Sequence, residues 1–185
     1  MFKCHNGLIA IVACLLLVTS CQVDYDKALP QEKYFFDLKA FFQGEKQRLK
    51  QIPAFVKTTT INQQSETHEL DNLSLDEELQ IFENSDINRV SWLDKYEVDS
   101  LLTDGTLTSI HYKALTPKLK TQDIQIRYDN QQVSEIQIQN FSSSNILSAS
   151  QKLIYRPASG YSIQSLQKML LSEEKEIMVE VEFRR

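Results

Sequence analysis

Cysteine is nearly absent from this chain: its three residues, Cys4, Cys14 and Cys21, all lie near the amino terminus. None occurs from position 22 to position 185, so that long segment cannot form an internal disulfide. Glycine is also scarce, with four residues in all. The glycine-rich loops that hold phosphates and the Gly-x-Ser-x-Gly turn of many serine hydrolases are absent, which argues against both classes of site.

Histidine is limited to three residues, and only His68 and His111 follow the first twenty positions. They are too far apart in sequence for the His-x-x-x-His spacing of a helical zinc site. A zinc site would need both of them beside carboxylates, and a hydrolase would need one beside a serine or carboxylate in a cleft. We therefore expect no catalytic residue, no metal and no cofactor.

Basic clusters are missing as well. The chain carries 20 Lys and Arg against 25 Asp and Glu, a net charge of −5. A mildly acidic chain without a basic patch argues against nucleic acid as a partner.

The longest apolar run, Leu8 to Val18, is short. As a helix it would span about 16 Å, roughly half of a hydrocarbon core of ~30 Å. One lysine, Lys3, precedes it, and the small residues Thr19 and Ser20 follow. This pattern predicts an export signal peptide rather than a membrane-spanning helix.

The end of that signal, Val18-Thr19-Ser20-Cys21, resembles the lipobox of bacterial lipoproteins. The resemblance implies cleavage between Ser20 and Cys21 and acyl chains such as palmitate on Cys21, which then becomes the contact with the membrane. Gln22, in place of aspartate, implies sorting to the outer membrane, facing the periplasm. Two acyl chains hold a protein at a bilayer where one is marginal. The alternative is an ordinary secretory signal cut nearby, leaving Cys21 free.

The remainder is long enough for one domain with a real core. We expect a signal peptide over 1–20, a lipidated tether over 21–29 and a single α+β domain over 30–185. Apolar residues at helical spacing predict a helix over 32–51, with Lys39, Lys46 and Lys50 on its exposed side. A second helix begins at Ser74, with Glu77 completing a capping box.

From Leu107 onward, apolar and polar residues alternate, which is typical of half-buried strands. Strand composition or alternation is found over 55–61, 107–114, 124–128, 136–139, 147–155 and 177–183. A polar stretch, 62–72, indicates a loop or an irregular strand pair. Ser162 begins a predicted short helix with Ile163, Leu166 and Leu170 on one side. We therefore expect an antiparallel sheet of about five to six strands, with one face covered by the aromatic N-terminal helix and this C-terminal helix.

The segment Asp86-Ile87-Asn88-Arg89, with Trp92 nearby, resembles a segment of small uncharacterised envelope lipoproteins. That resemblance implies no activity. One interpretation makes Asp86, Asn88, Trp92 and Asp94 a binding spot. The favoured one has Asp86 capping a short helix and Trp92 packed in the core.

Two functions remain open. The first is a lipid-anchored periplasmic accessory or binding protein of the bacterial cell envelope, with an envelope protein as its possible partner and no catalytic activity. The second is a carrier of a lipid or another apolar ligand in a curved-sheet cavity of roughly 300 Å³ or more. Its predicted lining is Tyr112, Ile126, Tyr128, Ile138, Val179 and Phe183.

Overall fold

The computed structural model describes residues 33–184, which belong to one compact unit. The predicted signal peptide, the lipidation site Cys21 and the tether over 21–29 lie outside the described residues. The helices are α2 (Leu38–Leu49), α3 (Leu75–Glu83) and the short 3₁₀ helix η1 (Val90–Trp92). The strands are β1 (Ala54–Ile61), β2 (Gln64–Leu70), β3 (Tyr96–Thr103), β4 (Thr106–Ala114), β5 (Thr121–Asp129), β6 (Gln132–Ser143), β7 (Leu147–Arg156), β8 (Gly160–Met169) and β9 (Lys175–Arg184).

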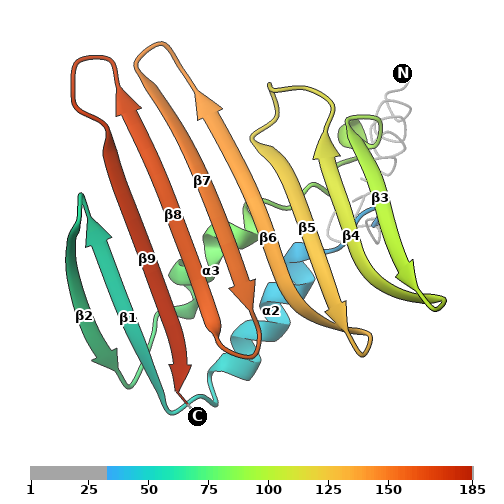
Figure 1. Ribbon diagram of the computed structural model, residues 1–185, viewed down its shortest axis with the longest axis horizontal. Coiled ribbons are helices and arrows are strands. Elements are labelled where there is room, and N and C mark those ends of the chain that lie inside the picture. The colour runs from blue at the N-terminus through green and yellow to red at the C-terminus, as the bar shows by residue number, and fades with distance from the viewer. Residues whose placement is uncertain (1–32, 185) are drawn as a thin grey trace, which may run out of the picture. The chain divides into compact units, whose positions relative to one another are not determined.

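All nine strands form one open antiparallel sheet in the order β2-β1-β9-β8-β7-β6-β5-β4-β3. From β3 to β9, each strand pairs with its neighbour in sequence, and β1 joins β9 to complete the sheet. Both helices lie against the same face (Figure 1). The antiparallel sheet and its N-terminal helix were predicted, but the described chain is mostly β and has nine strands rather than five or six.

The missed strands include both edges of the sheet. Strand β2 is exposed along almost its whole length, and β3 is exposed beyond its first residue, Tyr96. An edge strand that buries no side-chain stripe shows no strong alternation of apolar and polar residues. The polar stretch over 62–72, predicted as a loop or an irregular strand pair, contains the turn after β1 and the edge strand β2.

The predicted C-terminal helix is wrong, because Ser162 to Met169 is part of strand β8. Strand β8 pairs with β7 along one edge and with β9 along the other. Ile163 of β8 lies opposite Leu153 of β7 and Val179 of β9. Leu166 and Leu170, expected to be buried, are 39% and 71% exposed. Their spacing fits a helix, but two ladders of backbone hydrogen bonds favour the strand.

Helix α2 begins after Asp37, whose side chain accepts a hydrogen bond of 3.0 Å from the Ala40 amide. This is an N-cap, and Pro53 prevents the helix from continuing far beyond Leu49. The predicted apolar side is confirmed, since Leu38, Phe42 and Leu49 are buried.

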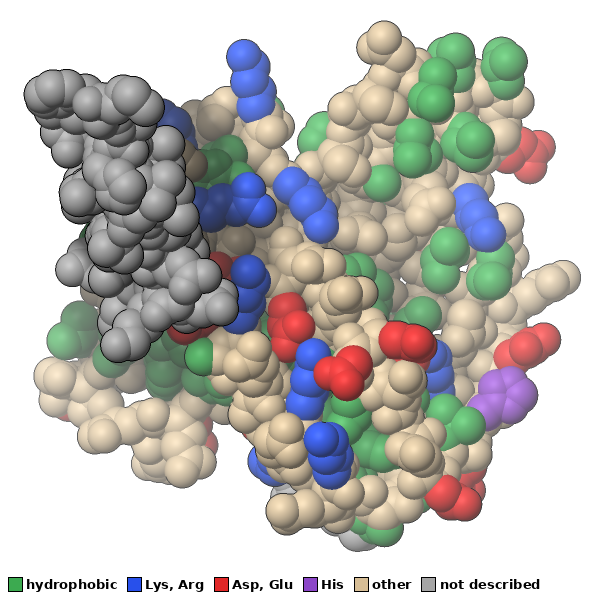
Figure 2. Space-filling model, turned by 180° about the vertical axis from the view of Figure 1, so that it is seen from behind, with side chains coloured by type: hydrophobic (Ala, Val, Ile, Leu, Met, Phe, Trp, Pro, Cys, Tyr) green, Lys and Arg blue, Asp and Glu red, His purple; other side chains and the backbone are tan. Residues whose placement is uncertain are grey.

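Lys46, predicted on the exposed side of α2, instead contacts α3. Its Nζ lies 3.0 Å from an Asp76 oxygen and 2.9 Å from a Glu83 oxygen. Burial lowers the pKa of Lys46, but hydrogen bonds to Glu83 and Asp76 outweigh it, so the pKa is raised. Figure 2, which views the molecule from behind, shows acidic and basic side chains intermixed there. The pairing ties the two helices together.

The second predicted helix is confirmed as α3, and it buries Leu75, Leu79 and Phe82, which share one face at helical spacing. Its predicted capping box is wrong: Ser74 is the N-cap residue, but its side chain makes no capping hydrogen bond. Three acidic residues in the first turn, Asp76, Glu77 and Glu78, interact favourably with the positive end of the helix dipole.

An aromatic cluster joins the helices to the middle of the sheet. The ring centroids of Phe42 and Phe82 are 5.0 Å apart, and those of Phe42 and Tyr155 are 4.9 Å apart. Tyr155 and both phenylalanines are fully buried. Such ring pairs add about 0.5–1.5 kcal/mol each beyond burial of their area. Within residues 33–184, no helix is long and apolar enough to cross a membrane.

Candidate functional site

The sheet face opposite α2 and α3, here called the open face, is predominantly polar. The buried side chains of each central strand point towards the helices, so the alternate ones point away. Strand pairing aligns one such outward-pointing side chain from each strand in a row across the sheet. From β3 to β2 these residues are Asp99, His111, Gln125, Gln137, Ile154, Ser162, Glu180, Thr58 and Thr67. The row is almost entirely polar, as the alternation of apolar and polar residues predicts for half-buried strands.

Three charged residues form a network on this face. The side chains of Arg127 and Arg156 both contact Glu135, the latter at 2.6 Å. Gln137 donates a further hydrogen bond of 2.6 Å to the same carboxylate. The Glu135 side chain is only 10% exposed, whereas the two arginines are 48% and 49% exposed. The carboxylate therefore fixes two guanidinium groups that remain open to solvent, and this fixed geometry suits them to bind polar groups.

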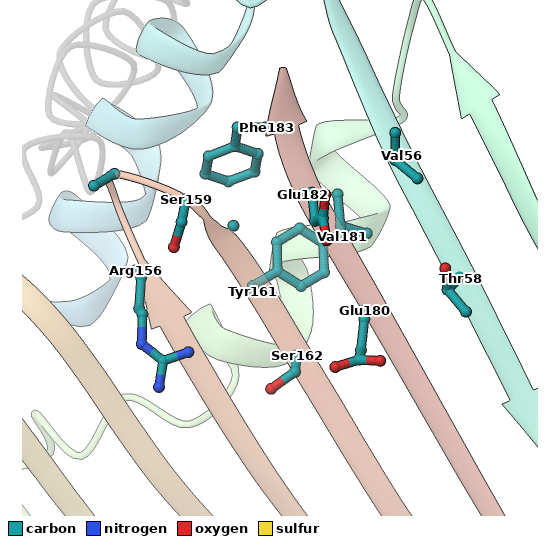
Figure 3. Close-up of a pocket in the computed structure, with 12 residues that line it drawn as sticks. Val56, Thr58, Arg156, Ser159, Tyr161, Ser162, Glu180, Val181, Glu182 and Phe183 are labelled. Carbon is teal, nitrogen blue, oxygen red and sulfur yellow. The ribbon is translucent and has the colours of Figure 1, made fainter. Parts of the chain in front are cut away.

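A hollow of about 480 Å³ lies beside this network (Figure 3). Its lining is Val56, Thr58, Arg156, Ala158, Ser159, Gly160, Tyr161, Ser162, Glu180, Val181, Glu182 and Phe183. Arg156 from β7, Ser162 from β8 and Glu180 from β9 lie across it in that order. The groups around it are thus a cation, hydroxyls and carboxylates, which together can hold a polar ligand by hydrogen bonds.

Gly160 sets the shape of the hollow's floor. Its φ is +148°, and a Cβ atom built on it would lie 1.9 Å from the Val181 carbonyl oxygen. Only glycine permits this close approach between the start of β8 and the end of β9. The predicted strand over 147–155 ends just before this turn, but the proximity of Gly160 to Glu182 depends on the pairing of β8 with β9, which the sequence does not reveal.

The six residues predicted to line an apolar cavity lie in or against the core. Tyr112, Ile126, Ile138 and Phe183 are buried, and Tyr128 and Val179 pack against the same core. Phe183 also borders the polar hollow. In the structure, these side chains therefore pack in or against the hydrophobic core.

Asp86 and Asn88 hold the chain that leads into α2. Asp86 accepts a hydrogen bond of 3.1 Å from the Leu38 amide. Asn88 accepts one from each of the Tyr34 and Phe35 amides, at 3.1 and 3.0 Å. It also donates to the Phe36 carbonyl oxygen at 3.1 Å. These are structural roles, and the helix that Asp86 supports is α2 rather than a short neighbouring one.

The other two members of the predicted binding spot point elsewhere. Trp92 is partly buried and packs near Tyr96, with the Arg89 guanidinium 4.4 Å from its ring centroid. Asp94 pairs with Lys95 at 2.8 Å on the surface. The four residues therefore do not form one site.

The histidines lie apart from the hollow. His111 Nε2 is 2.7 Å from an Asp123 oxygen on the open face, and the His68 side chain is 67% exposed, 3.8 Å from Glu66. Neither histidine is among the residues around the hollow. Over residues 33–184, no group of three or more His, Cys, Asp or Glu side chains is arranged to hold a metal ion.

A scan against protein-family models, a search of curated proteins and a search of solved structures each found no significant match to this chain.

Proposed function

We propose that this chain is a lipid-anchored protein of the bacterial cell envelope that binds a partner and has no catalytic role. The observation that carries the proposal is the sequence Val18-Thr19-Ser20-Cys21 at the end of an eleven-residue apolar run. An exported chain with one cysteine would carry an unpaired thiol, and acylation of Cys21 removes it. The anchor places the domain beside a membrane, in the periplasm and at the outer membrane.

The open face supports a binding role. Arg127 and Arg156 are fixed by Glu135 yet half exposed, and a polar hollow adjoins Arg156. Fixed side chains lose little entropy on binding, so they favour recognition of another polar surface. We propose that the envelope partner contacts this face.

The carrier hypothesis gains no support from its own residues. Side chains that fill a core, such as Ile126 and Ile138, cannot also surround a ligand. We therefore favour a protein partner over an apolar cargo.

Affinity capture from detergent-solubilised membranes tests the proposal, with the tagged chain at its native level. We expect one envelope protein to be recovered in a fixed ratio with the wild type and to be lost with Arg156→Ser. Lys118→Ser is the matched control, because it removes an exposed cation from the connection between β4 and β5. Unfolding temperatures of both variants show whether they fold. Recovery of the wild-type chain without any partner would contradict the proposal.

A further inference from the structure

Exposed apolar side chains gather at one end of the sheet. Successive strands run in opposite directions, so the β1–β2, β4–β5, β6–β7 and β8–β9 connections share that end. This apolar end consists of Ile61, Leu115, Ile146, Leu147, Met169, Leu170 and Leu171. Single exposed apolar residues are ordinary, but a gathered group marks a contact surface.

Two hairpins form the most prominent part of the apolar end. Leu147 pairs with Met169, and the Leu170 amide donates a hydrogen bond of 3.0 Å to the Ile146 carbonyl oxygen. The side chains of Ile146, Leu170 and Leu171 are 67%, 71% and 97% exposed. Figure 2 shows hydrophobic side chains gathered at its upper right, over these connections. The two tips therefore present one joint apolar surface.

The described chain begins at this same end. The Phe36 amide donates a hydrogen bond of 3.1 Å to the Tyr112 hydroxyl, and Tyr112 lies two residues before the end of β4. The Phe35 ring packs against Tyr96, the first residue of β3, which pairs with Ala114. Both positions adjoin the connection that carries Leu115. The described chain, which the tether from Cys21 precedes in sequence, therefore enters the domain at its apolar end.

From these observations we infer that the apolar end rests on the lipid bilayer, with Ile146, Leu170 and Leu171 entering the boundary between headgroups and acyl chains. The inference rests on the proposed lipid anchor. Eleven residues lie between Cys21 and Lys33, so this part of the chain reaches at most about 40 Å. Such a short tether keeps the apolar end at a high local concentration of lipid. A few inserted side chains are then enough to hold the domain against the bilayer.

The geometry favours lipid over a second protein. Leu171 protrudes at a hairpin tip with almost its whole surface exposed, and a fluid bilayer accommodates such a protrusion without a matching pocket. Charges around the tip are mixed: Lys168 and Lys175 lie near Glu173 and Glu174. The contact therefore depends on apolar insertion more than on anionic headgroups.

Site-directed spin labelling of the full lipidated chain tests this inference. The chain has no cysteine after Cys21, so Leu171→Cys introduces one new thiol for a nitroxide, at a side chain 97% exposed. The control is Leu101→Cys, 60% exposed near the β3–β4 turn at the opposite end. In vesicles of phosphatidylethanolamine and phosphatidylglycerol, we expect oxygen to relax the label at 171 several-fold more than a water-soluble nickel chelate does. For the label at 101, we expect the chelate to cause more relaxation than oxygen.

Two results would overturn the inference. The first is a label at 171 that is as accessible to the chelate as the label at 101. The second is a label protected from both reagents, which indicates a protein contact. Thiol labelling of the wild-type chain is read separately: a reactive Cys21 would refute the anchor itself. An unreactive Cys21 with a chelate-accessible 171 would refute only the bilayer contact.

Discussion

Gly160 is the single residue on which the polar hollow most depends. Its backbone lies so close to β9 that any side chain would meet the Val181 carbonyl group. Backbone atoms of a central strand cannot move aside as a flexible side chain can. The position therefore requires glycine for a steric reason as well as for its positive φ.

Gly160→Ala is expected to lower the free energy of unfolding by about 2–4 kcal/mol, the sum of overpacking and backbone strain. Gly44→Ala is the matched control. Gly44 lies within helix α2, and a Cβ there would meet nothing within 4 Å. Alanine should stabilise that helix by about 0.5–1 kcal/mol. Urea unfolding of both variants measures the two effects, and an equal response to both substitutions would contradict this account of Gly160.

At the scale of elements, two tyrosine–carboxylate pairs connect the helices to the sheet. The Tyr155 hydroxyl of β7 donates to Glu45 of α2 at 2.5 Å, and the Tyr161 hydroxyl of β8 donates to Glu78 of α3 at 2.6 Å. Arg48 also pairs with Glu45, and Lys57 with Glu78. Each helix thus places one acid over the sheet, where a cation and a phenol share it.

These pairs predict a loss of stability at alkaline pH. Burial, followed by the hydrogen bond to Glu78, raises the pKa of Tyr161 above its usual value of 10.0. The folded state therefore retains a proton that the unfolded state loses above pH 10, so stability is complete below that pH and falls above it. Tyr161→Phe should cost about 1–2 kcal/mol at pH 8 and make the decline above pH 10 shallower. Urea unfolding between pH 8 and 11 measures both, and equal slopes for the variant and the wild type would contradict the assignment.

Elements with one buried and one exposed side were predictable from the sequence. The alternation around Tyr112, Ile126 and Val181 locates β4, β5 and β9 because burial imposes a period of two. Strand β8 was mistaken for a helix because Ile163, Leu166 and Leu170 also fit a period near 3.6. The edge strands β2 and β3 bury too little to show either period.

The open-face site could not be predicted, because its members come together only through strand pairing. Arg127, Glu135 and Arg156 lie on three different strands, and each alone is typical of a solvated surface. The available signal was a glutamate at an outward position of one strand, β6, with an arginine at an outward position of each strand that flanks it. Recognising that signal in the sequence would have required knowing the register in which β5, β6 and β7 pair.

At the scale of the whole molecule, the domain has three distinct surfaces. One sheet face is covered by α2 and α3, the open face carries fixed arginines and a polar hollow, and the apolar end adjoins Phe35 and Phe36, among the first described residues. Our proposals give each exposed surface a task. The apolar end meets lipid, which leaves the open face accessible to a partner within the envelope.

Intact-mass spectrometry of the full chain, purified from bacterial membranes, tests the central claim most directly. We predict a polypeptide that begins at Cys21 and carries the added mass of a diacylglyceryl group, with or without a further acyl chain on its amino group. A polypeptide with an unmodified Cys21, or one cut at another residue, would contradict the account.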